Sequence, residues 1–95
     1  MMPDNHLGKQ MRITGNWKLE KGDKTYIKVV DFPDENGAPA ESMWVILVSG
    51  DDNEGIGRLD NDPIIFNHPR GTLVKFGGGT NNFKPSFIEV TGHTE

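Results

Sequence analysis

The stretch from Met43 to Val48, MWVILV, decides the fold because it is an unbroken apolar run in the middle of the chain. Ser49 and Gly50 end this run, which is too short for a helix of ordinary length. An apolar run of this length, bounded by turn residues, is typical of a strand that is buried on both faces. We therefore predict that Met43–Val48 is the central strand of a β fold.

Two further strands are predicted on the N-terminal side of this run. Between Met11 and Leu19 the odd positions are apolar or glycine and the even positions are polar, which is the pattern of a half-buried strand. From Thr25 to Phe32, β-branched and aromatic residues dominate, so this segment is predicted to pair antiparallel with the first. The alternation places one group on each face of this strand: Tyr26, Val30 and Phe32 on one, and Ile27 and Val29 on the other.

Short strands separated by turns are also predicted on the C-terminal side. The loop Pro33–Ser42 is the one stretch with room for a helical turn, and we expect it to be mobile. In the last strand, Ile88 and Val90 are predicted to share the inner face with Ser86. The predicted strands are Ile56–Leu59, Ile64–Phe66, Thr72–Phe76 and Ser86–Thr91.

The spacing of these strands predicts the fold class. Six to seven short strands without a crossover helix indicate a mostly β chain, either a small antiparallel SH3-like barrel or a compact sandwich, with at most one helical turn. A length of 95 residues is enough for one domain. We expect a disordered N-terminal segment at 1–10, a single β domain at 11–92 and a tail at 93–95.

The composition excludes several classes of function. Without cysteine the chain has no disulfide, zinc–thiolate site, iron–sulfur cluster or thiol nucleophile. The 14 Asp and Glu against 10 Lys and Arg disfavour non-specific attraction to nucleic acid or to anionic lipid. No stretch contains the ~18 apolar residues of a membrane span. We predict a soluble, cytoplasmic protein that does not associate with membranes and needs no cofactor.

The motifs that could carry chemistry are incomplete. Gly77-Gly78-Gly79-Thr80 lacks the lysine and the following helix of a phosphate-binding loop. The acidic turns Asp51–Glu54 and Asp60–Asp62 lack the spacing of an EF-hand, and the histidines are scattered. No serine lies in a nucleophile elbow. We therefore predict neither a catalytic site nor a metal site, and expect that the protein is not an enzyme.

Four short motifs near the middle of the chain occur together: Phe32-Pro33-Asp34, Met43-Trp44-Val45, Gly57-Arg58-Leu59-Asp60-Asn61-Asp62-Pro63 and Gly71-Thr72-Leu73-Val74. In this combination the chain resembles the bacterial domains of unknown function numbered 2314. The resemblance spans about half of the chain, from Tyr26 to Phe76. It implies binding rather than catalysis, because related small domains occur near toxin–immunity and mobile-element genes, and it transfers no functional residue. Thr72 replaces the usual Asp of that family, and Phe83–Phe87 replaces its closing Asp-Trp segment.

The candidate binding residues lie toward the C-terminus. Phe83 and Phe87 would anchor a protein partner if both rings were exposed, with Lys84 and Arg70 completing the contact set; the alternative is that both rings are buried. We therefore expect a non-enzymatic bacterial or phage-type protein that binds another protein, of the immunity-protein or inhibitor type. The alternative function is a small barrel that binds single-stranded nucleic acid through Lys75, Lys84 and Arg70.

Overall fold

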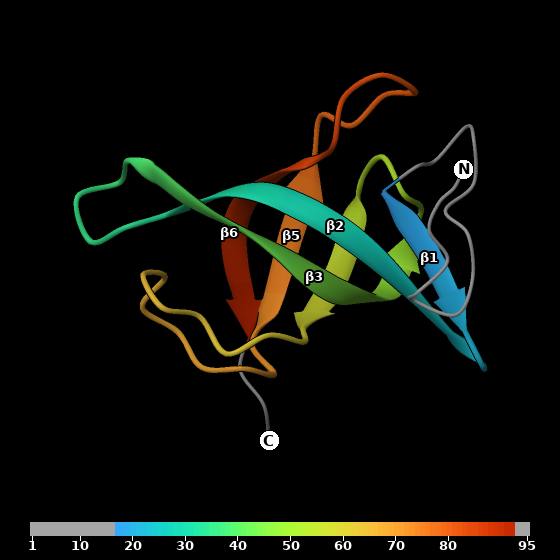
Figure 1. Ribbon diagram of the computed structural model, residues 1–95, viewed down its shortest axis with the longest axis horizontal. Coiled ribbons are helices and arrows are strands. Elements are labelled where there is room, and N and C mark those ends of the chain that lie inside the picture. The colour runs from blue at the N-terminus through green and yellow to red at the C-terminus, as the bar shows by residue number, and fades with distance from the viewer. Residues whose placement is uncertain (1–16, 93–95) are drawn as a thin grey trace, which may run out of the picture.

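The computed structural model describes residues 17–92, which form six strands and no helix. Strands that follow one another in the chain pair antiparallel, and a parallel contact between β2 and β6 closes five of them into a barrel, with β1 as an extra strand on β2 (Figure 1). The predicted mostly β fold, a small barrel, is confirmed, and the barrel is consistent with the SH3-like type. The strands are β1 (Lys18–Lys21), β2 (Lys24–Pro33), β3 (Pro39–Gly50), β4 (Gly55–Leu59), β5 (Leu73–Gly77) and β6 (Ser86–Gly92).

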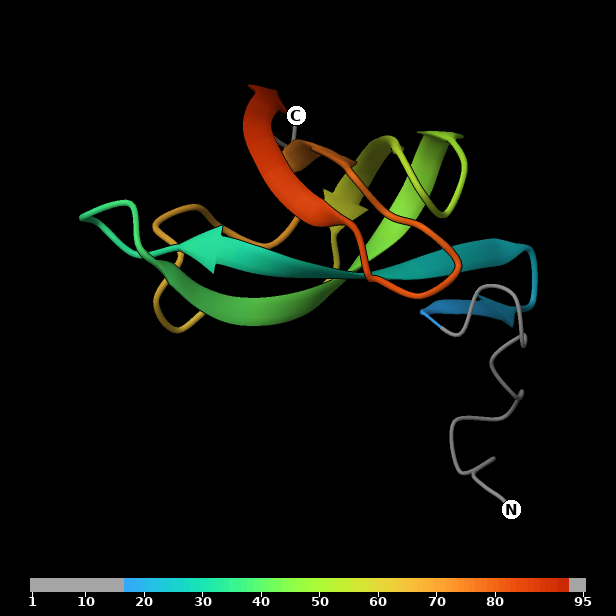
Figure 2. The ribbon, with the colours of Figure 1, turned by 90° about the horizontal axis from the view of Figure 1, so that it is seen from above.

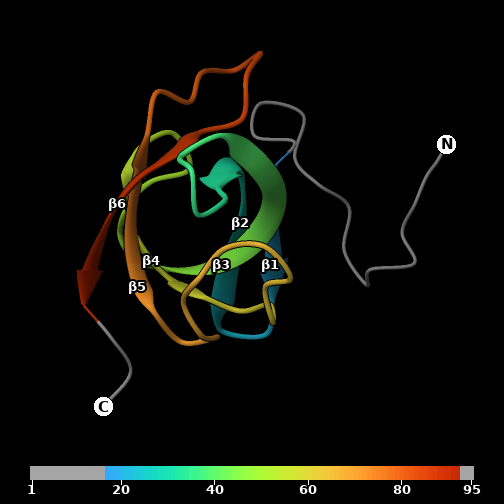
Figure 3. The same ribbon diagram turned by 90° about the vertical axis from the view of Figure 1, so that its left-hand side faces the viewer.

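The hydrophobic core fills the barrel, which is seen end-on in Figure 3. Every barrel strand contributes apolar side chains to it, because alternate residues of a strand point to the same side. Trp17 and Leu19 are also buried but do not belong to this core. Leu19 lies opposite Tyr26, so these two side chains are on the same face of the sheet. Tyr26 is next to Ile27, which points into the core, so Leu19 and Tyr26 belong to the outer face. The buried core residues are Ile27, Val29, Phe32, Met43, Val45, Leu59, Phe66, Val74 and Phe76.

A β-bulge in β2 allows the barrel to close. Val29 pairs with Met43 and Phe32 with Glu41, so β2 has one residue more than β3 between these two pairs. Asp31 lies in this bulge, and its φ of 64° is in the left-handed region. Within the bulge, Val30 pairs with Ser86 of β6. One strand thus pairs with β3 and also reaches β6.

Because of the bulge, the predicted assignment of residues to the two faces of β2 is wrong for Phe32. Phe32 was expected on the opposite face from Ile27 and Val29, but all three side chains are fully buried in the core. The extra residue reverses the alternation after Val29, so Phe32 returns to the inner face. A strict two-residue pattern therefore failed at the bulge.

β2 and β3 form a hairpin that projects beyond the other strands (Figure 2). The strands extend into the predicted loop Pro33–Ser42, so only 34–38 form a turn, and that turn contains no helix. Asp34 stabilises the turn, since its Oδ1 accepts the N–H of Asn36 at 2.8 Å and of Ala38 at 3.0 Å. The prediction of a long loop was wrong because this side chain closes a tight turn.

The central run was predicted to be buried on both faces, and this was wrong for the outer face. Met43 and Val45 are in the core, whereas Trp44 and Ile46 on the outer face are half-buried. Val48 is 55% exposed, at a register shift between Leu47 and Ser49. The barrel covers only one face of β3.

Two register shifts also rearrange β6. They occur opposite the pairs Leu73/Val74 and Lys75/Phe76 of β5. Ile88 is 52% exposed instead of inward, while Phe87 and Val90 pack on the core. The predicted inner face of the last strand was therefore correct for Val90 and wrong for Ile88.

The remaining predictions fall partly outside the described residues. β1 contains the end of the predicted first strand, whereas 11–16 of that strand, the segment 1–10 and the tail 93–95 lie outside 17–92. Because 17–92 contain no helix, they contain none long and apolar enough to cross a membrane.

Candidate functional site

Glu41 of β3 fixes the middle of the connection between β4 and β5, which we call the 60–72 loop. Its carboxylate accepts the N–H groups of Ile64 at 3.1 Å, Ile65 at 2.8 Å and Phe66 at 2.5 Å. Burial by itself raises the pKa of this carboxyl, but the three hydrogen bonds outweigh burial and lower the pKa below its ordinary value of 4.5. An ionised side chain therefore binds three successive backbone groups of the loop.

The prediction of a strand at Ile64–Phe66 was wrong. Pro63 offers no N–H to a neighbouring strand, and Glu41 binds the N–H groups that a ladder would otherwise use. The β-branched and aromatic composition of this segment thus belongs to a loop that a side chain holds in place.

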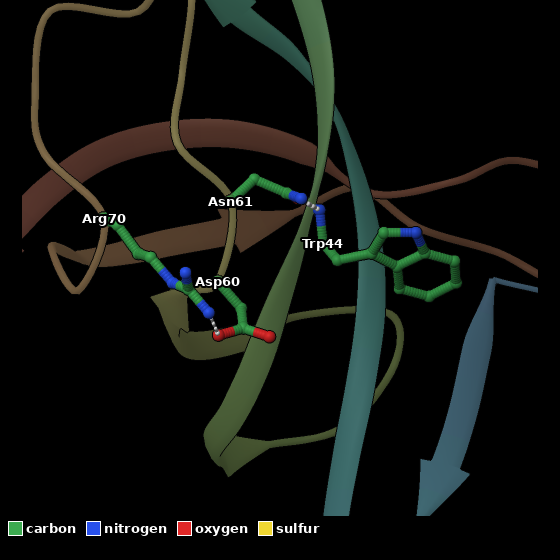
Figure 4. A network of polar contacts seen from close by, with 4 residues as sticks. All are labelled: Trp44, Asp60, Asn61 and Arg70. Carbon is green, nitrogen blue, oxygen red and sulfur yellow. Dashed lines mark hydrogen bonds and ion pairs between the residues drawn. The ribbon is translucent and has the colours of Figure 1, made fainter. Parts of the chain in front are cut away.

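A second set of bonds holds the ends of the loop (Figure 4). The N–H of Asp60 donates to the carbonyl of Trp44 at 3.0 Å, and the N–H of Trp44 donates to Oδ1 of Asn61 at 2.6 Å. Arg70, near the other end of the loop, donates to Oδ1 of Asp60 at 3.2 Å. These bonds continue the edge of β3 where β4 has ended, so the loop covers backbone groups that would otherwise face water.

Phe66 attaches the same loop to the core. Its ring centroid lies 4.9 Å from that of Phe32 and 5.2 Å from that of Phe87, in edge-to-face contacts. The ring of His68 also contacts Phe66, with the two centroids 5.0 Å apart. The loop crosses one end of the barrel in Figure 3, and the side chain of Phe66 belongs to the hydrophobic core.

The anchored loop presents two isoleucines to solvent. Ile64 is 90% exposed and Ile65 is 45% exposed, although Phe66 next to them is buried. An open hollow lined by residues 62–70 lies within the loop. The 60–72 loop is therefore an apolar surface on a firmly held backbone.

The structure divides the predicted protein-contact set. Arg70 lies in the 60–72 loop, whereas Phe83 and Lys84 lie in the loop 78–85, and the two loops leave opposite ends of β5 (Figure 1). Phe83 is 69% exposed, but Phe87 packs on the core, with its ring centroid 5.1 Å from that of Phe32. The expected exposed pair of rings is thus one exposed ring and one that is partly buried.

The loop 78–85 holds Phe83 through a local turn. Thr80 Oγ1 accepts the N–H groups of Asn82 and Phe83, each at 3.1 Å, and the N–H of Thr80 donates to the carbonyl of Phe83 at 2.9 Å. Gly79 passes close to the β3–β4 turn, where a Cβ would lie 2.9 Å from Asn53 Cα. The glycine run that suggested a phosphate loop thus has a packing role.

The predicted nucleic-acid set is also divided. Lys75 lies on β5, opposite Ile56 and Glu89, whereas Lys84 lies in the loop 78–85 and Arg70 in the 60–72 loop. Lys84 instead acts electrostatically on Lys28 of β2. Sequence reasoning missed Lys28 because its neighbours come from pairing between strands, which local patterns do not reveal.

The acidic turn 51–54 and Ser86 have structural contacts in the described residues. Asp51 Oδ1 accepts the N–H of Asn53 at 2.9 Å and of Glu54 at 3.0 Å, and these bonds lower its pKa. Ser86 donates its hydroxyl to Asp31 at 2.9 Å. Within 17–92, no three His, Asp or Glu side chains are grouped so that they could hold a metal ion.

No family model, curated protein or solved structure matches this chain. The resemblance to the domains numbered 2314 therefore stays a prediction.

Proposed function

We propose that the protein is a non-enzymatic binding module that docks on a protein partner through the 60–72 loop. The observation that carries this proposal is the 90% exposure of Ile64 beside a backbone held by Glu41. Burying such a side chain contributes about 1.5–3 kcal/mol, and the fold does not use this gain. A partner with an apolar pocket would use it.

The geometry of the loop favours tight binding. Glu41 and Phe66 hold the backbone before any partner arrives, so docking requires little further ordering of the loop. Arg70 and Asp62 lie around the isoleucines as polar groups, which resembles the polar rim of known interfaces. A module of this kind acts by covering a surface of its partner, as an immunity protein or an inhibitor does.

The test is capture of a partner from nuclease-treated lysate of the source cells. We expect the wild type to retain a specific protein and Ile64→Asp to lose at least about 90% of it, because a carboxylate in an apolar pocket is strongly unfavourable. Ile88→Asp is the matched control, since Ile88 is also an exposed isoleucine but lies on β6. It should retain the partner.

Equal capture by Ile64→Asp and the wild type would contradict the proposal. Loss of the partner with Ile88→Asp alone would place the interface on β6 instead. Circular dichroism of each variant establishes that the barrel remains folded.

A further inference from the structure

A second surface lies on the outer side of β2 and β3. We call it the aromatic–lysine face and define it by Trp17, Lys28, Trp44, Phe83 and Lys84. It is separate from the 60–72 loop, and the protein-binding proposal does not depend on it. Three of its side chains are aromatic and two are cationic.

Strand pairing brings the first three of these residues into a row. Lys28 lies opposite Trp44 in the β2–β3 register, and its Nζ is 5.2 Å from the centre of the Trp44 ring. On its other side, the N–H of Lys28 donates to the carbonyl of Trp17 at 2.6 Å. The ammonium of Lys28 is therefore held against an aromatic ring.

The loop 78–85 adds Phe83 and Lys84 to this row. The N–H of Val30 donates to the carbonyl of Pro85 at 3.0 Å, which places Lys84 beside the strand that carries Lys28. The loop 78–85 and β2 together line a groove, whose residues include Trp17, Val30, Asp31, Phe83, Lys84 and Ser86.

The two lysines repel each other. Burial lowers the pKa of Lys28, and the charge of Lys84 lowers it further. Neither lysine forms an ion pair with a carboxylate among residues 17–92. Lys21 and Lys24, which pair with each other on the β1–β2 hairpin, lie on the same face as Lys28 by strand alternation and add positive charge to this side of an otherwise acidic molecule. Lys18 lies on the opposite face and forms an ion pair with Glu20. An anion at this surface would relieve the repulsion.

Trp17 has a buried hydrogen-bond donor without an acceptor among the described residues. Its side chain lines the groove and is only 4% exposed, yet the indole N–H has no acceptor in the described part of the chain. A buried donor of this kind is unfavourable until an acceptor reaches it.

We propose that the aromatic–lysine face binds a single strand of nucleic acid, with phosphates at Lys28 and Lys84 and an unpaired base stacked on Phe83. Phe83 is 69% exposed and is held by the Thr80 turn, so one face of a base has a ring to stack on. An exposed ring beside two cations that have no carboxylate partner matches what a strand of alternating bases and phosphates requires. A duplex, whose bases are already stacked, fits this arrangement less well.

The proposal is tested by fluorescence anisotropy with a labelled single-stranded oligonucleotide of about eight nucleotides at low ionic strength, within the ~4–16-nucleotide range of such sites. We expect Phe83→Ala to weaken binding at least about fivefold through loss of stacking. Lys84→Gln should weaken it and reduce the slope of log affinity against log salt by about one phosphate contact. Lys75→Gln, an exposed lysine on β5, is the matched control and should bind as the wild type does.

A second variant tests the charge argument in the opposite direction. Asp31 is the one carboxylate among the groove residues, and Asn accepts a hydrogen bond from Ser86 and tolerates the left-handed backbone of this position. Asp31→Asn should therefore tighten oligonucleotide binding while the barrel stays intact.

Several results would overturn the proposal. These are no binding at low ionic strength, equal binding of duplex and single strand, weakening by Lys75→Gln as large as by Lys84→Gln, or displacement of the oligonucleotide by an acidic peptide at lower concentration than by unlabelled oligonucleotide. A mononucleotide that binds as tightly as the oligonucleotide would also overturn the proposal, because it would indicate a site for one nucleotide and not for a strand.

Discussion

Single side chains determine where this barrel departs from a simple alternating pattern. Asp31, with its φ of 64°, reverses the alternation of β2, and Glu41 holds a loop far along the chain. Neither role could be predicted from the sequence. An aspartate within a strand pattern does not by itself predict a bulge. The hydrogen-bond partners of Glu41 lie 23 to 25 residues away in the chain. Such contacts depend on pairing between strands rather than on neighbours in the sequence.

Glu41 allows a prediction at the scale of one residue. Glu41→Gln should lower the free energy of unfolding by about 1–2 kcal/mol at neutral pH, a discounted value because two of its three bonds are exposed to solvent. The folded pKa of Glu41 is lowered, so its contribution is complete above the ordinary value of 4.5 and is lost as the pH falls through the folded pKa. Urea unfolding of both proteins at several pH values measures this.

The expected result is a stability difference that shrinks as the solution is acidified. A difference that stayed constant from neutral to acidic pH would mean that Glu41 contributes through packing and not through its charge. Glu54→Gln is a suitable control, because Glu54 is exposed in the β3–β4 turn.

At the scale of whole elements, the strands could be predicted and their ends could not. Each of the six strands overlaps a predicted one, because apolar alternation and turn residues are local signals. The segment Ile64–Phe66 has the composition of a strand but lies in a loop, because proline precedes it and Glu41 binds its N–H groups. Composition reports what could form a strand, and the available backbone partner decides whether one forms.

The 60–72 loop depends on one ring for its attachment to the barrel. Phe66→Ala should lower the free energy of unfolding by about 3–5 kcal/mol, because it leaves a cavity between Phe32 and Phe87. Ile64→Asp, two residues away but exposed, should change stability by less than about 0.5 kcal/mol. Thermal or chemical unfolding of the two variants measures the difference. Similar stabilities would show that Phe66 does not close the barrel.

At the scale of the whole molecule, the sequence predicted a small β-barrel or a sandwich, of which the barrel is correct, and it grouped residues from two separate surfaces into one contact set. Phe83, Lys84 and Arg70 are close in the chain, but β5 runs between the two loops that carry them. Trp44 and Lys28 are distant in the chain and adjacent in space. The candidate residues could therefore be found by type, whereas their grouping required the register of the strands.

The separation of the two surfaces gives a final prediction. A five-residue strand is roughly 16 Å long, which exceeds the Debye length of about 8 Å at physiological salt, so charges at its two ends interact weakly. Ile64→Asp should abolish protein capture and leave oligonucleotide affinity unchanged, whereas Lys84→Gln should weaken oligonucleotide binding and leave protein capture unchanged. In the double variant the two losses should add without coupling. The measurement is anisotropy titration with and without the captured partner. If the partner displaced the oligonucleotide, the two binding surfaces would overlap, and the division between the ends of β5 would be wrong.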